Sequence, residues 1–281
     1  MTATVTQPKT TDDKAGMIRH DAHYFSARTI DGQRTLLEQS YRLRYQVYCL
    51  ERKFLRAEDY PNGMEIDEFD ARAAHIGAID SHGELAGTAR VVRSSGRGLP
   101  IFEHCAIFPY ETEFTPDNPR LVEVGRLSVS RSYRRRQCDR PFLAGATSVR
   151  VDGAGFAGHD RRGQHEDVFL TLLKGLYQAA KRAGATHWLA ATEKPLQRLL
   201  AQRGFPFHQI GPDSDYFGIV APYRMDLQEF EDVIMSGQYP DLEDFLVGFE
   251  PGPTSADVRR DDAVTPGDDG SRSAQTPAGA A

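Results

Sequence analysis

Two charged residues, Glu123 and Arg126, stand three positions apart in a segment of apolar and small residues that reads as a buried strand. Side chains alternate along a strand, so these two are expected on opposite faces. A charge in a core strand is costly unless it is paired or used. Gly125 suggests a bulge, and one extra residue would bring Glu123 and Arg126 to the same side. We predict a bulged strand with Glu123 as general base; an ordinary salt bridge at a strand end is the alternative.

The charge pattern continues in a basic run directly after this strand. The run reads as a loop, because it follows the last apolar residue of the strand and is almost entirely polar. It is either a docking patch for an acidic partner or a solvated loop. A nucleic-acid site is disfavoured, because the run has no interleaved aromatic residues and the chain carries a net charge of −6. The arginines of the run are Arg131, Arg134, Arg135 and Arg136.

The composition indicates a soluble globular protein, with 40% apolar and 26% charged residues among 281. Three cysteines, with no C-x-x-C pair, give neither a disulfide framework nor a zinc cluster, and they fit a reducing compartment. The N-terminal segment has no apolar stretch of the signal-peptide kind. No apolar run approaches the roughly 20 residues that span a bilayer. We expect a cytoplasmic protein without a transmembrane segment.

A second concentration of charge lies in the stretch 57–70, where six of 14 residues are Asp or Glu. Its Pro-Asn-Gly sequence predicts a loop. Glu65, Asp67 and Asp70 could converge there on a cationic group such as an amine. A calcium or magnesium site is one alternative, since oxygen ligands suit these ions, although the spacing is not that of an EF-hand. A solvated acidic loop is the other.

The elements before the Glu123 strand carry further candidates. The spacing of Leu37, Tyr41, Tyr45 and Tyr48 predicts a helix over 34–54. Its simplest interpretation is a tyrosine-rich core face with solvated arginines. A strand is expected over 23–30, and a hairpin over 74–93 places Arg90 at a core position of its second strand. A short helix is expected near Phe102.

The elements after the Glu123 strand complete a mixed α/β pattern that indicates one sheet. We expect a single domain over 21–250 with a flexible insertion at about 138–165, and disordered tails at 1–20 and 251–281. The expected helices and strands are a helix over 167–182, a strand over 187–191, a helix over 195–202, strands over 205–210 and 216–225, and helical pieces over 227–249.

This order of elements resembles the GNAT acyl-CoA N-acyltransferase fold, a mixed sheet with a bulged fourth strand that splays from the fifth to admit a pantetheine arm. Within that fold, four motifs resemble those of acyl-homoserine-lactone synthases and N-acyl amino acid synthases. The amino-acid sequences of several segments, such as Ala57-Glu-Asp-Tyr-Pro-Asn-Gly63, resemble even more closely those of acyltransferases associated with PEP-CTERM/exosortase systems. The four motifs are Arg44-x-x-x-Tyr48 with Phe54, Glu65-x-Asp67-x-x-Asp70, Gly87-x-x-Arg90, and Glu123-x-x-Arg126-Leu-x-Val129.

The resemblance implies transfer of a fatty acyl group from an acyl-carrier-protein or coenzyme A thioester to the amine of a small amino-acid-like acceptor. It implies no tightly bound cofactor and no metal. Glu123 and Arg126 would be catalytic. An ion-pair lattice that fixes the N-terminal part is the alternative role for the charged residues, and both roles can hold together. The implied substrate-binding residues are Arg44, Tyr48, Phe54, Glu65, Asp67, Asp70 and Arg90.

One departure from the GNAT pattern bears on the acyl donor. The loop Gln/Arg-x-x-Gly-x-Gly/Ala, which binds the coenzyme A pyrophosphate, is absent, and Glu166 and Asp167 open the following helix. These acids would repel a phosphate, so a carrier protein that docks on the basic run is favoured. An autoinducer synthase that uses S-adenosylmethionine is a rival, although Phe54 stands where those enzymes usually have tryptophan. A non-catalytic GNAT-like module that binds an acyl carrier is the other rival.

Overall fold

The computed structural model describes residues 25–95, 98–133, 168–216 and 218–247. The expected tails at 1–20 and 251–281, the insertion at 138–165 and three arginines of the basic run, Arg134, Arg135 and Arg136, lie outside these residues. None of the described helices is both long enough and apolar enough to cross a bilayer. The division of the chain into one domain and two tails stays a prediction.

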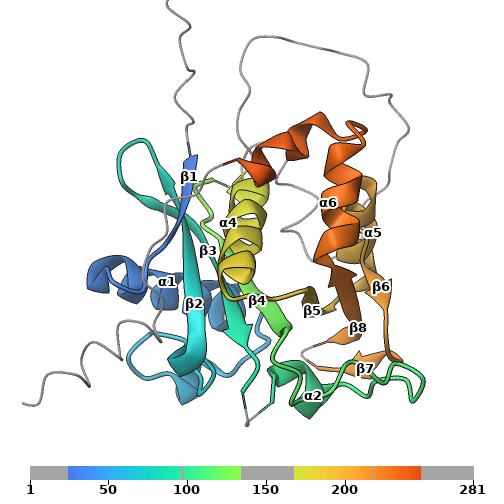
Figure 1. Cartoon of the computed structure of the whole chain (residues 1–281). Helices are drawn as coiled ribbons and strands as arrows, with labels where there is room; N and C mark the ends of the chain where they lie inside the picture. Colours follow the sequence, from blue (N-terminus) through green and yellow to red (C-terminus); the bar gives the residue numbers. More distant parts are fainter. Residues whose placement is uncertain (1–24, 96–97, 134–167, 217, 248–281) are drawn as a thin grey trace, which may run out of the picture.

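The described residues form one mixed sheet of eight strands, in the order β1-β2-β3-β4-β5-β8-β6, with β7 paired to β8 (Figure 1). All pairs are antiparallel except β4 with β5, which are parallel. The predicted mixed α/β architecture is confirmed. The strands are β1 (Phe25–Thr29), β2 (Ala73–Asp80), β3 (Leu85–Arg93), β4 (Leu121–Val129), β5 (His187–Thr192), β6 (His208–Gln209), β7 (Ser214–Asp215) and β8 (Ile219–Asp226).

Helices cover both faces of the sheet (Figure 1). The helix α4 packs on β1 to β4, where Ile76 and its neighbours meet Leu172 and Leu176 in the main core. The helix α1 packs on the opposite face, toward which the alternate residue His75 points. The α-helices are α1 (Arg34–Tyr45), α2 (Pro100–His104), α4 (Val168–Arg182), α5 (Lys194–Gln202) and α6 (Leu227–Met235). The other helical turns are η1 (Gln46–Glu51), η2 (Ala57–Asp59), η3 (Asp70–Arg72) and η4 (Pro240–Leu246).

The first helix differs from its prediction in two ways. It ends as an α-helix at Tyr45 and continues to Glu51 as the π-helical segment η1. Its buried positions include Leu36, Leu43 and Arg44 rather than a tyrosine stripe. The interpretation of its arginines as solvated is wrong for Arg44, which is only 1% exposed. Burial of this guanidinium is possible because carboxylates surround it, as the site shows below.

The strand expected over 205–210 is reduced to the two residues of β6. Pro206 has no N–H to donate to a ladder, and Phe205 and Phe207 on either side of it are buried in the main core instead. The core therefore takes these aromatic side chains without a regular strand.

The predicted bulge is present in β4, one residue later than Gly125 suggested. Thr88 pairs with Ser128 and Arg90 with Gly125, so two residues of β4 lie opposite Ala89 alone. Arg126, the first of these two, has φ +51°, a left-handed conformation that is uncommon for a residue with a side chain. Because of the extra residue, Leu127 returns to the α4 core and Arg126 joins Glu123 on the other side.

The strands β4 and β5 separate immediately after Glu123. Their parallel pairing extends only from Leu121 opposite His187 to Glu123 opposite Leu189. Beyond that point β5 continues along β8 and β4 continues along β3. Glu123 therefore stands where the sheet divides, and two residue pairs separate it from the bulge.

Candidate active site

Glu123 is a buried carboxylate with one oxygen held in place. Its residue is 8% exposed, and the N–H of Ile101 in α2 donates to Oε2 at 2.7 Å. Burial raises the pKa of Glu123 from 4.5 to about 7, although the Ile101 hydrogen bond and the charges of Arg90 and Arg126 act in the opposite direction. Among the described residues, Oε1 has no hydrogen-bond partner. The group can therefore accept a proton near neutral pH.

Arg126 lies beside Glu123 and is held from the other side by the acidic loop. Its Nε donates to Glu65 Oε1 at 3.1 Å and its Nη2 to Asp67 Oδ2 at 3.0 Å. The guanidinium carbon lies 5.4 Å from the ring centre of Tyr48, a cation–π contact. The Tyr48 hydroxyl donates to the carbonyl of Leu127 in the bulge at 3.4 Å. These contacts fix the left-handed residue in place.

Open space adjoins these groups at Gly125. A Cβ built on Gly125 would meet no atom of the described residues within 4 Å. The neighbours Glu123 and Arg126 are both largely buried, so this space lies at the division of β4 and β5 rather than on a fully exposed surface. It offers room for a reacting group next to Oε1.

Arg126 belongs to a lattice of six charged side chains. Arg44 donates to Glu65 and, with both terminal nitrogens, to Asp70 at 2.6 and 3.0 Å. Arg90 bonds Asp67 in the same bidentate way at 2.6 and 2.7 Å and also reaches Asp70 at 2.7 Å. Three guanidinium groups thus face three carboxylates, and bidentate geometry makes each pair directional. The ion-pair arrangement considered from the sequence is present.

The lattice is nearly dry, and its charges depend on one another. The side chains of Arg44, Glu65, Asp70 and Arg90 are at most 3% exposed. Burial opposes ionisation of Asp70, but Arg44, His75 and Arg90 outweigh it and hold the pKa of this carboxyl far below its usual range. The acidic loop is therefore not a solvated loop. Within the described residues, no group of three His, Cys, Asp or Glu side chains is arranged to hold a metal.

The two aromatic candidates lie at the rim of the lattice. Tyr48 comes from η1, and such π-helical segments are frequent at functional sites. The ring of Phe54 lies against Tyr48 with centroids 6.2 Å apart, and the guanidinium of Arg52 covers Phe54 at 5.5 Å. The chain thus places an aromatic pair next to Arg126.

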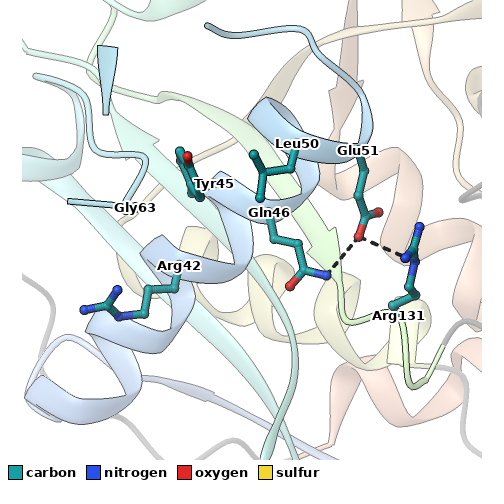
Figure 2. A pocket seen from close by; sticks show the side chains of 7 residues that line it. All are labelled: Arg42, Tyr45, Gln46, Leu50, Glu51, Gly63 and Arg131. Atoms are coloured by element: carbon teal, nitrogen blue, oxygen red, sulfur yellow. Dashed lines mark hydrogen bonds and ion pairs between the residues drawn. The ribbon is translucent and has the colours of Figure 1, made fainter. Parts of the chain in front are cut away.

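Arg131, the one described arginine of the basic run, lies apart from Glu123. Its side chain is 76% exposed, and Nε lies 3.9 Å from Glu51 Oε1. It lines a cavity of about 660 Å³ on the outer side of α1 and η1, in which Glu51 stands between Gln46 and Arg131 (Figure 2). The other lining residues are Arg42, Tyr45, Leu50 and Gly63.

The structure adds residues that the sequence did not point to. The ring of Tyr216, between β7 and β8, stacks on His104 of α2 with centroids 3.9 Å apart. Burial raises the pKa of Tyr216, although the charge of Arg126 and its hydrogen bond to the hydroxyl act in the opposite direction. Ile101, which bonds Glu123, belongs to the same short helix α2. A five-residue helix and a two-residue strand carry no periodic signal that could have placed these groups at Glu123.

Comparison with known proteins agrees with this geometry. Residues 43–142 match the acetyltransferase (GNAT) domain model. An acyl-homoserine-lactone synthase of Aliivibrio fischeri is 23% identical over 172 residues, which are 60% of this chain and 73% of the relative.

Solved structures match the fold over a longer stretch. The structure of a CoA-dependent acyl-homoserine lactone synthase, BjaI, with SAM and isopentyl-CoA superimposes with a TM-score of 0.55 at 19% identity, covering 85% of this chain and 98% of that one. The CoA-dependent synthase MesI gives a TM-score of 0.50 at 20% identity, covering 80% and 97%. These likenesses confirm the predicted GNAT-like fold.

The domain match over residues 43–142 and the sequence relatives define the class: this chain is an acyltransferase, an enzyme that transfers acyl groups. Within that class it is related to the acyl-homoserine-lactone synthases.

The raised pKa of Glu123 predicts that Glu123→Gln stabilises the fold at alkaline pH. The carboxyl favours the folded state fully below its unfolded pKa of 4.5, and this contribution is lost as the pH rises through about 7. A pKa rise of this size corresponds to a difference of about 3 kcal/mol in the free energy of unfolding between low and high pH. Gln keeps the shape and an oxygen for the Ile101 N–H. Urea unfolding at pH 5 and pH 8.5 should therefore show the variant gaining stability over the wild type at the higher pH.

Glu103→Gln provides the matched control, because Glu103 is exposed on the same helix as Ile101. This control should follow the wild-type stability at both pH values. Equal stability of wild type and Glu123→Gln at pH 8.5 would contradict the burial argument.

Proposed function

We propose that this chain moves a fatty acyl group from a phosphopantetheine thioester to the amine of a small amino-acid-like acceptor. The observation that carries the proposal is Glu123 itself: a buried carboxyl with a pKa of about 7, placed where β4 and β5 separate, whose Oε1 has no hydrogen-bond partner in the described part of the chain. Acyl transfer to an amine needs a base that can take the proton of the attacking nitrogen near neutral pH. Glu123 meets this need.

The proposed reaction proceeds through a tetrahedral intermediate. Glu123 Oε1 accepts a proton from the acceptor amine, the nitrogen forms a bond to the thioester carbonyl carbon, and the C–S bond breaks to release the thiolate. The carbonyl oxygen becomes negative in between and needs preorganised donors. We assign this task to backbone N–H groups at the bulge around Gly125, next to the open space described above. The proton held by Glu123 then neutralises the leaving thiolate.

The acceptor binds, in this proposal, at the exposed rim of the lattice. The side chains of Asp67 and Arg126 are 20% and 14% exposed, and they can meet the amine and the carboxylate of an amino acid. Tyr48 and Phe54 form the apolar edge. The buried members contribute by holding this rim in position rather than by direct contact. These are Arg44, Glu65, Asp70 and Arg90.

The donor is an acyl carrier protein or coenzyme A, which share the phosphopantetheine arm. We favour the carrier protein, because the exposed Arg131 opens a basic run that suits an acidic surface. The segments that resemble PEP-CTERM/exosortase-associated acyltransferases weigh against S-adenosylmethionine as the acceptor. The second candidate is an autoinducer synthase with S-adenosylmethionine as acceptor, which the Aliivibrio fischeri relatives favour.

Mass spectrometry of products from the purified chain tests the proposal. Palmitoyl carrier protein and palmitoyl coenzyme A are each offered with a mixture of amino acids or with S-adenosylmethionine. We expect an N-acyl amino acid, formed faster from the carrier protein. Glu123→Gln should lower the rate by at least about 100-fold, the usual range for a general base.

Other outcomes decide between the alternatives. Formation of an acyl-homoserine lactone together with methylthioadenosine would show that the acceptor is S-adenosylmethionine and not an amino acid. Binding of acyl carrier protein without any product would support a non-catalytic module and overturn the proposal. Undiminished product from Glu123→Gln would remove Glu123 as the base.

The open space at Gly125 predicts a graded effect of side-chain size. Gly125→Ala should fold with the wild-type melting temperature, because an added Cβ meets no described atom within 4 Å, and Gly125→Val extends two further atoms from that position. Both place atoms next to Glu123, so we expect kcat/KM to fall about 10-fold for Ala and more than about 100-fold for Val. Wild-type kcat/KM in Gly125→Val would show that no substrate uses this space.

A further inference from the structure

His75 on β2 lies between two carboxylates with almost no access to solvent. Its side chain is 1% exposed. Nδ1 lies 2.7 Å from Asp31 Oδ1, and Nε2 lies 3.0 Å from Asp70 Oδ1. A carboxylate can only accept, so each of these contacts is a hydrogen bond only if the ring nitrogen carries a proton. Asp31 also accepts the backbone N–H of His75 at 3.1 Å.

We infer that His75 is a positioning residue: a doubly protonated imidazolium that acts as the fourth cation of the lattice and, through Asp70, holds Arg126 at the site. The inference rests on the proposed function for its catalytic consequence. Its structural content, the charge of His75, stands on the geometry alone.

The groups around His75 favour the protonated, positively charged form of its imidazole ring. Asp31 precedes α1, Asp70 lies in η3, and Arg90 is the cross-strand partner on β3. From α1, Arg44 faces Asp70, and the Tyr41 hydroxyl lies 3.5 Å from Nε2. Burial opposes the charge, but the hydrogen bonds to both carboxylates outweigh burial and raise the pKa of His75. With Asp31 and His75 included, four cations face four carboxylates.

The path from His75 to the site runs through a single oxygen. Asp70 Oδ1 accepts from Arg44 at 2.6 Å, from Arg90 at 2.7 Å and from His75 at 3.0 Å. Loss of the Nε2 proton would replace one donor by a lone pair that points at this oxygen. Asp70 would then move away and carry Arg90 with it.

Arg90 transmits this displacement to the exposed rim. It holds Asp67 by two hydrogen bonds, and Asp67 in turn holds Arg126 at 3.0 Å. Arg126, the first residue of the bulge, follows Glu123 by three positions on β4, and its charge acts on this carboxyl. Deprotonation of His75 is therefore expected to lower activity at high pH, whereas protonation of Glu123 lowers it below about pH 7.

The charge of His75 can be measured without any activity assay. In the wild-type chain labelled with ¹⁵N-histidine, both ring nitrogens of His75 should show the chemical shifts of protonated nitrogen from pH 6 to pH 8. His75→Gln assigns the signals. A ring with one unprotonated nitrogen at pH 7 would overturn the inference, whether or not the chain proves to be an acyltransferase.

The positioning role is tested with Asp31→Asn, which removes one carboxylate from His75 and leaves every group near Glu123 unchanged. The pKa of His75 should fall, so the alkaline limb of the kcat/KM profile should move at least one pH unit lower while the acid limb stays in place. The matched control is Glu38→Gln, since Glu38 is exposed on α1 and pairs with Arg34 at the surface. It should move neither limb. A uniform loss of activity at all pH values in Asp31→Asn would indicate a merely structural role and contradict the inference.

Discussion

The structure depends on one constraint: charges buried beneath α1 must be compensated within a nearly dry interior. An unpaired guanidinium or carboxylate there would be strongly destabilising, and removal of one partner from a buried pair typically costs about 3–5 kcal/mol. The lattice meets this constraint by bidentate pairing of Arg44 with Asp70 and of Arg90 with Asp67. Because each carboxylate serves two or more donors, no single pair can be exchanged without affecting the others. The loop over 57–70 is thereby fixed to α1 and β3.

The proposed chemistry depends on Glu123, a carboxyl group that takes no part in the ion-pair lattice of the described residues. Among the described residues, Glu123 receives one backbone N–H and no guanidinium hydrogen bond, so burial dominates and its pKa rises to about 7. Asp70, which receives three side-chain cations, is held in its charged form. Neighbouring carboxyl groups with such different environments are typical of enzymes that separate a proton-accepting residue from binding residues. The bulge at Arg126 connects the two environments, since this residue belongs to the lattice and lies beside Glu123.

Much of this arrangement could be predicted from the sequence. The hairpin β2–β3, the helix α4 and the central strand have strong periodic patterns, and they appear close to their expected bounds. The bulge followed from the need to place Glu123 and Arg126 on one side, although the left-handed residue is Arg126 and not Gly125. The sequence predicts two roles for the charged motif residues, substrate binding and an ion-pair lattice, and the lattice is present. Their binding roles stay predictions.

The parts that could not be predicted depend on contacts between distant segments. Asp31 and His75 are 44 residues apart, and only the packing of β2 against the turn before α1 joins them. Ile101 and Tyr216 reach the site through elements of five and two residues. The π-helical segment η1, which aims Tyr48 at Arg126, has no sequence period that differs clearly from that of an α-helix.

A direct titration of Glu123 tests the central claim. In the chain labelled with ¹³C at the side-chain carboxyl of glutamate, the resonance that is missing from Glu123→Gln reports this group alone. We expect it to titrate with a midpoint close to 7, because burial outweighs the hydrogen bond from Ile101. A midpoint at or below about 5, the ordinary range for glutamate, would contradict the role of Glu123 as a base near neutral pH. Glu123 would then be an ordinary buried hydrogen-bond acceptor, and the base would have to be sought elsewhere.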